Sequence, residues 1–91
     1  MNEQELRQSL ERERDALLKA RDELKLQLHL ANLEAKEQWD QLERKWEAVS
    51  AELGKLSTHT KAPLDDISKA ARSLFGEIKS GYERVRDQLK G

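Results

Sequence analysis

Cysteine is absent from this chain of 91 residues, proline occurs once, glycine four times, and aromatic side chains number four (two Trp, one Tyr and one Phe). The lack of cysteine excludes disulfides and thiolate metal sites and suits a reducing compartment, so we expect a cytoplasmic protein. No apolar run approaches the roughly 18–20 residues that cross a bilayer. The start of the chain lacks the basic and apolar segments of a secretory signal.

Charge of one sign is also lacking, because 17 basic residues face 18 acidic ones. A nucleic-acid-binding domain of this size normally has a basic excess, so no nucleic-acid partner is expected. What the chain does contain is 38% charged and 36% apolar residues, a composition typical of long helices and coiled coils. So few apolar residues can fill a narrow seam between helices. We therefore predict an all-α fold.

The apolar residues predict a long first helix over about 3–57. From Leu28 to Leu56 they recur at alternating intervals of four and three, which is a heptad seam. Towards the N-terminus the seam thins to Leu6, Leu10, Leu17 and Leu24. Joining the two sections requires consecutive four-residue steps near Leu28, a stutter that locally unwinds a supercoil.

Ser, Thr and Pro at 57–63 interrupt this pattern and predict a loop over 58–62, followed by a second helix over about 63–89. So short a loop makes the helices antiparallel neighbours. Counting outward from the loop pairs Trp46 with Leu74 or Phe75, and Trp39 with Gly81 and Tyr82. The predicted hairpin core consists of Leu28, Ala35, Trp39, Leu42, Trp46, Val49, Leu53, Leu56, Leu64, Ile67, Ala71, Leu74, Phe75, Ile78, Tyr82, Val85 and Leu89.

The predicted helices differ in length, and this difference predicts self-association. The second helix covers only the later half of the first, so residues 1–27 have no partner within the chain. A hairpin of this size also buries little apolar surface. We therefore expect a single domain over 1–91 that forms a homodimer or a larger helical bundle, such as a four-helix bundle of two hairpins. The residues expected to carry this association are Leu6, Leu10, Leu17, Leu24, Leu26, Leu30 and Leu33.

Few side chains suggest chemistry. Asn32 lies on the seam, where it either selects register and oligomeric state or lies at the stutter and reaches solvent. His29 and His59 are far apart, and no Glu-x-x-His pair of the ferritin-like kind accompanies them. No Gly-rich phosphate loop or nucleophile–base spacing is present. We accordingly expect no catalytic residues, no cofactor-binding residues and no metal ligands.

Three segments of the chain are distinctive: 23–39 (ELKLQLHLANLEAKEQW), 42–46 (LERKW) and 77–86 (EIKSGYERVR). Together they resemble small bacterial coiled-coil proteins of about this length, some of which are labelled stress-response proteins. The resemblance implies a bacterial protein that is cytoplasmic or peripheral to a membrane. It brings no catalytic residues, and it draws attention to His29 and to 81–84.

The function expected from the sequence is therefore structural, with no enzymatic activity. The chain would associate with copies of itself and could also dock a helix of another protein. The alternative is an amphipathic protein that lies on a membrane surface. The polar faces mix both charge signs instead of being rich in Lys and Arg, which favours the first interpretation.

Overall fold

The computed structural model describes residues 3–55 and 64–90, and every regular element within these ranges is helical. Helix α1 covers Glu3–Gln27, a short 3₁₀ turn η1 covers Leu28–Leu30, α2 covers Leu33–Gly54 and α3 covers Leu64–Lys90. The prediction of an all-α protein is confirmed. Within the described part of the chain, no helix is both long and apolar enough to cross a membrane.

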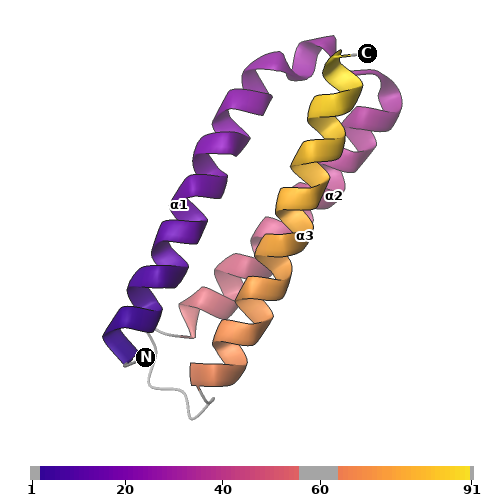
Figure 1. The fold of residues 1–91 in the computed structure, drawn as a ribbon. Coiled ribbons are helices and arrows are strands. Elements are labelled where there is room, and N and C mark those ends of the chain that lie inside the picture. Colours follow the sequence, from indigo (N-terminus) through magenta and orange to yellow (C-terminus); the bar gives the residue numbers. More distant parts are fainter. Residues whose placement is uncertain (1–2, 56–63, 91) are drawn as a thin grey trace.

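The three helices lie side by side along one axis (Figure 1). The chain ascends α1, reverses at η1, descends α2 and ascends again in α3, so α1 and α3 run in the same direction. The molecule measures 45 × 19 × 17 Å. Helix α3 packs against both α1 and α2, whereas α1 and α2 approach each other closely at only a few positions.

The first helix predicted over about 3–57, whose continuity past residue 28 the sequence left open, is divided in two, because the chain turns at residues 28–32. Ala31 leaves the helical region with φ −75° and ψ 142°, and its N–H donates to the carbonyl oxygen of Leu28 at 3.0 Å. Asn32 then starts α2 as its N-cap: its side-chain Oδ1 accepts a hydrogen bond from the N–H of Ala35 at 2.8 Å. Asn is among the preferred N-cap residues because its short side chain satisfies an amide that the first turn leaves free.

Because the chain turns here, the N-terminal leucines have a partner in the same chain. Leu6, Leu10 and Leu24 are buried, and Leu10 and Leu24 belong to one core cluster with residues of α2 and α3. The prediction that residues 1–27 lack an intramolecular partner is therefore wrong, as is the two-helix hairpin with an N-terminal extension. The physical reason is that α3 presents apolar side chains to two sides, so α2 alone does not cover it.

The predicted pairing of the second half of the first helix with the last helix is largely found between α2 and α3. The buried members of the predicted hairpin core are Ala35, Trp39, Leu42, Trp46, Val49, Ile67, Ala71, Phe75, Ile78, Tyr82 and Val85. Its half-buried members are Leu28, Leu53, Leu64, Leu74 and Leu89. Leu56 lies outside the described residues.

Candidate functional site

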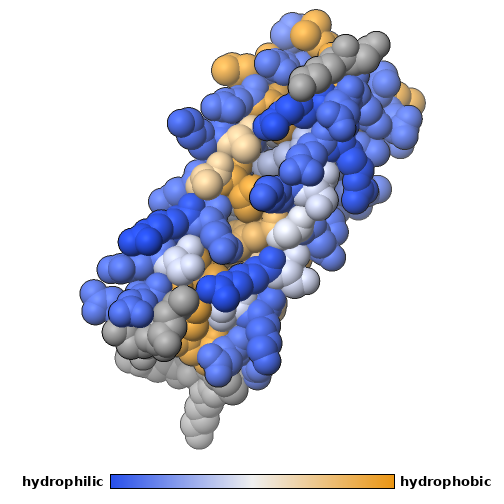
Figure 2. Space-filling model, in the orientation of Figure 1, coloured by the Kyte–Doolittle hydropathy of each residue, from blue (hydrophilic) through white to orange (hydrophobic). Residues whose placement is uncertain are grey.

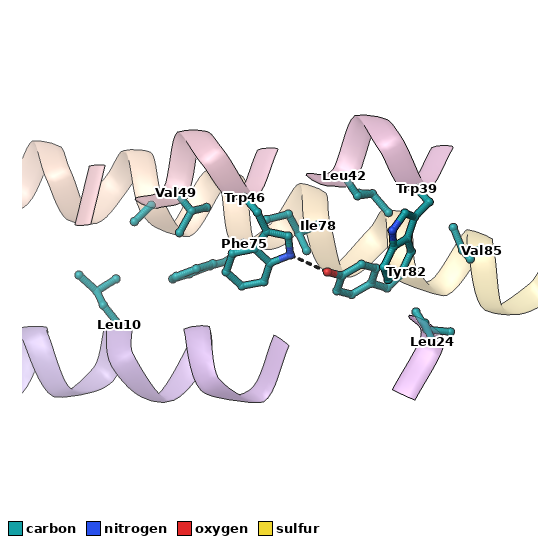
Figure 3. Packing of buried hydrophobic residues seen from close by; sticks show 11 residues of the cluster. Leu10, Leu24, Trp39, Leu42, Trp46, Val49, Phe75, Ile78, Tyr82 and Val85 are labelled. Atoms are coloured by element: carbon teal, nitrogen blue, oxygen red, sulfur yellow. Dashed lines mark hydrogen bonds between the residues drawn. The ribbon is translucent and has the colours of Figure 1, made fainter. Parts of the chain in front are cut away.

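The centre of the core is an aromatic cluster formed by α2 and α3 (Figure 3). Trp39 and Trp46 are seven residues apart on α2 and therefore lie on the same face, two turns from each other. The ring of Tyr82 stacks on Trp39 with the centroids 5.7 Å apart, and Phe75 packs against Trp46 at 6.4 Å. Aromatic pairs at such distances stabilise a core beyond the area they bury, so this cluster fixes how α2 and α3 fit together.

Two polar atoms inside the cluster satisfy each other. The indole Nε1–H of Trp46 donates a hydrogen bond to the hydroxyl oxygen of Tyr82 (Figure 3). Tyr82 is 2% exposed, and burial raises the pKa of its hydroxyl above the ordinary value of 10.0 because the ionised form would lose its hydration. The hydroxyl therefore stays protonated at neutral pH and acts as a structural group within the core.

An ion pair between Arg21 and Glu43 bridges α1 and α2. The guanidinium of Arg21 contacts the carboxylate of Glu43 with two parallel hydrogen bonds, 2.7 Å from Nε to Oε1 and 2.8 Å from the second nitrogen to Oε2. The hydrogen bond to Glu43 is the main cause that raises the pKa of Arg21. Both side chains are about a quarter to a third exposed. The bidentate geometry fixes the position of α1 along α2, although the two backbones touch little.

Between α1 and α3 the surface forms an open groove of about 560 Å³. Its floor is apolar: the buried rings of Phe75 and Tyr82 lie on the α3 side, and the half-buried Leu17 and Ala20 lie on the α1 side. Figure 2 shows this floor as an apolar strip between two polar helices. We call this feature the α1–α3 groove. Concave apolar surfaces with a few polar groups are where proteins most often bind ligands and peptides.

The rim of the α1–α3 groove is charged, and its cations follow a regular spacing. Arg72, Lys79 and Arg86 are exposed, line the groove and are separated by seven residues each along α3. At about 1.5 Å per residue they form a row roughly 21 Å long. None of the three makes an ion pair within 4 Å with any residue in 3–55 or 64–90. Glu13 and Glu83 also line the groove.

Small residues widen the α1–α3 groove. Ala16 on α1 and Gly76 on α3 both line it. A Cβ added at Gly76 would meet no atom within 4 Å, so no neighbour in the described structure requires glycine there. Glycine in a helix costs about 1 kcal/mol relative to alanine, so Gly76 lowers the stability of the fold. Without a side chain, Gly76 also leaves the helix backbone uncovered in the groove.

The remaining residues singled out in the sequence lie at the turn between α1 and α2. Asn32 is exposed and caps α2, so its interpretation as a seam residue that selects register is wrong and the solvent-exposed alternative holds. His29 is exposed, and its Nδ1 lies 3.1 Å from the carbonyl oxygen of Leu26. Leu26, Leu30 and Leu33 are exposed, and their role in self-association stays a prediction.

The α1–α3 groove was not predicted from the sequence. It exists because α1 and α3 are neighbours, and that neighbourhood follows from the turn at 28–32. The available signal was the seven-residue spacing of Arg72, Lys79 and Arg86 along one edge of the apolar stripe. In the described part of the chain, no three His, Asp or Glu side chains are grouped as metal ligands would be.

Comparison of the chain with protein-family models, curated proteins and solved structures finds no match. The resemblance to small bacterial coiled-coil proteins therefore stays a prediction.

Proposed function

We propose that this protein is a non-catalytic interaction module that binds an amphipathic, acidic helix of another protein in the α1–α3 groove. The observation that supports this proposal is the row of Arg72, Lys79 and Arg86 beside an open apolar floor. Recognition of an amphipathic helix by an apolar groove is a recurrent mode of peptide binding, in which residues on one helix face provide the anchors.

The length and spacing of the row suit a helix. Cations seven residues apart match carboxylates at the same spacing on a partner helix that lies along α3, since both repeat after two turns. A row of roughly 21 Å corresponds to about 14 residues of helix. Gly76 lies inside this row and leaves its backbone uncovered, which allows a partner to approach α3 closely.

The charges and the floor would contribute differently to binding. Ion pairs at a solvent-exposed rim are worth about 0.2–1 kcal/mol each, so three of them together change the affinity by about 3- to 150-fold. Burying one leucine-sized anchor on the floor contributes about 1.5–3 kcal/mol. With two or more such anchors the floor would supply most of the affinity, and the cations would select acidic partners and accelerate association at low salt.

Selection from a displayed library of 18-residue amphipathic helical peptides tests the proposal. Each heptad of the library carries Glu, Lys or Gln at one fixed position beside the apolar face. We expect Glu to be enriched at that position, and we expect the selected peptides to bind less tightly as salt is raised.

Two variants with matched chemistry locate the binding surface. Gly76→Phe places a ring in the α1–α3 groove and should weaken binding at least tenfold in a fluorescence anisotropy titration. Ser73→Phe places the same ring on an exposed position of α3 that does not line the groove, and it should leave binding within twofold. Equal losses in both variants would argue against the groove as the binding surface.

The membrane-surface alternative is tested in parallel. Sedimentation with vesicles of anionic phospholipid should leave the protein in the supernatant. If the protein pellets with the vesicles while the library yields no enrichment of Glu, the helix-binding proposal is wrong and a membrane-surface role replaces it.

A further inference from the structure

A second groove, of about 330 Å³, lies between α1 and α2. We call it the α1–α2 groove. It has one basic and one hydroxyl side chain, Arg14 on α1 and Ser50 on α2. The rest of its wall is apolar and consists of Leu18, Trp46, Val49 and Leu53. None of these residues lines the α1–α3 groove, so the two grooves are separate surfaces of the described structure.

The contact between α1 and α2 repeats after two helical turns. On α1, Arg14 precedes Arg21 by seven residues, and on α2, Ser50 follows Glu43 by seven residues. A step of seven residues returns to nearly the same face of a helix, about 10.5 Å further along its axis. Because α1 and α2 run in opposite directions (Figure 1), both steps lead to the same level. Arg14 and Ser50 therefore correspond to the bridging pair of Arg21 and Glu43.

The two levels differ in the group that α2 offers to the arginine. Arg21 contacts the carboxylate of Glu43 with hydrogen bonds of 2.7 and 2.8 Å, whereas Ser50 has only a hydroxyl. Arg14 uses two of the five N–H donors of an arginine on Oδ1 of its neighbour Asp15, at 3.2 and 3.1 Å. Its other donors make no hydrogen bond to a residue in 3–55 or 64–90. The Arg14 side chain is 39% exposed, so an anion in the groove can reach it.

We propose that the α1–α2 groove binds a small carboxylic acid with an apolar tail, which gives Arg14 the carboxylate that Glu43 gives Arg21. A carboxylate matches the planar guanidinium with two parallel, charge-assisted hydrogen bonds. The hydroxyl of Ser50 donates a further hydrogen bond to the same carboxylate. The tail lies on the apolar wall, and the groove lies within the range of about 300–1,000 Å³ of small-molecule sites.

Both parts of the ligand are required by the burial of the groove residues. An ion pair with a partly exposed arginine contributes little by itself, because water competes for both charges. The apolar wall contributes in proportion to the area that a tail removes from water: Leu18 and Leu53 are half-buried and offer such area. We therefore expect octanoate to bind, whereas butyrate has the charge without the tail and octanamide has the tail without the charge.

Proton–nitrogen correlation NMR of the full chain measures this binding, because the two indole N–H groups give separate signals. Trp46 lines the α1–α2 groove and Trp39 does not. Octanoate should shift the indole signal of Trp46 and move that of Trp39 far less. Octanamide and butyrate should each bind at least tenfold less tightly than octanoate.

Three variants locate the carboxylate. Ser50→Glu supplies a carboxylate from the chain itself and should lower octanoate affinity at least tenfold. Ser73→Glu adds the same charge at an exposed position of α3 that lines neither groove, and it should leave the affinity within twofold. Arg14→Gln should also lower the affinity at least tenfold. In thermal unfolding, Ser50→Glu should shift Tm upward relative to its effect in the Arg14→Gln chain, because only the parent chain offers a guanidinium to pair with.

Several outcomes would overturn the proposal. Equal affinities for octanoate and octanamide would show that the tail partitions onto the protein without recognition of the carboxylate. Equal losses in Ser50→Glu and Ser73→Glu would show that added charge repels the acid from anywhere on the surface. A Trp46 signal that does not move below the concentration at which octanoate itself aggregates would show that the groove does not bind it.

Binding of the acid is independent of helix binding in the α1–α3 groove. Gly76→Phe fills the α1–α3 groove and should leave octanoate affinity unchanged, whereas Arg14→Gln should leave peptide affinity unchanged. An octanoate affinity that falls with Gly76→Phe but not with Ser50→Glu would place the acid in the α1–α3 groove and overturn the proposal. Failure of one proposal therefore does not resemble failure of the other.

Discussion

Two glycines of α3 should respond to the same substitution with opposite signs. Gly76 and Gly81 both lie inside the helix, so replacing either by alanine removes an intrinsic cost of about 1 kcal/mol. A Cβ at Gly76 meets open space, whereas a Cβ at Gly81 would overlap Cδ2 of Leu42 and lie 3.0 Å from its Cδ1. Leu42 is 4% exposed, so it has little room to move.

The expected magnitudes follow from these neighbours. Gly76→Ala should stabilise the fold by about 1 kcal/mol, which raises Tm by roughly 4–8 °C in a domain of this size. At Gly81 the same gain is opposed by an overpacking cost of about 1–3 kcal/mol. Gly81→Ala should therefore be neutral to about 2 kcal/mol destabilising, and the two variants should differ by about 1–3 kcal/mol.

Urea denaturation followed by circular dichroism at two or more protein concentrations measures both changes. Combining Gly81→Ala with Leu42→Val should restore part of the loss, because the shorter side chain removes the overlap. Equal stabilisation by Gly76→Ala and Gly81→Ala would show that Leu42 is not packed against Gly81, and the arrangement of α2 against α3 described above would be wrong.

Three further experiments examine how α1 is held and how the core responds to pH. Leu10→Ala should lower the free energy of unfolding by about 2–5 kcal/mol, while Leu26→Ala should change it by less than about 0.5 kcal/mol in dilute solution; similar effects in both would mean that α1 is not docked. A double-mutant cycle on Arg21 and Glu43 should give a coupling energy of about 1 kcal/mol, and zero coupling would contradict the bidentate pair. Because burial raises the pKa of Tyr82 in the folded chain, the unfolded chain ionises first, so stability should fall as pH rises above about 10. Tyr82→Phe should remove this component of the alkaline loss, and an unchanged pH profile would refute it.

The sequence predicted the core between α2 and α3 well, for a reason that Trp39 and Trp46 illustrate. Apolar residues at strict four- and three-residue intervals define a helix face, and a short connection fixes which faces meet. The pairing of Trp46 with Phe75 and of Trp39 with Tyr82 followed from that counting. Gly81 was placed opposite Trp39 by the same counting, whereas the atoms nearest to a Cβ at Gly81 belong to Leu42, one turn further along α2.

The turn at residues 28–32 could not be predicted in the same way. The stutter near Leu28 and the polar Asn32 marked the correct place, but a locally unwound helix and a capped turn share both features. The bend is decided by burial of Leu10 and Leu24 against α3, a contact between residues distant in the sequence. The α1–α3 groove depends on that contact and was inaccessible to any local pattern.

The position of α3 between the other two helices has a consequence for how this chain assembles during folding. Helix α3 packs more extensively against α2 than against α1, and the connection from α2 to α3 is shorter than the chain between α1 and α3. We therefore expect the pairing of α2 with α3 to precede the docking of α1. Amide hydrogens of α1 should then exchange with solvent sooner than those of α3. Sequence change should be tolerated better on α1 than on α3, because α3 buries more of its side chains, against both other helices.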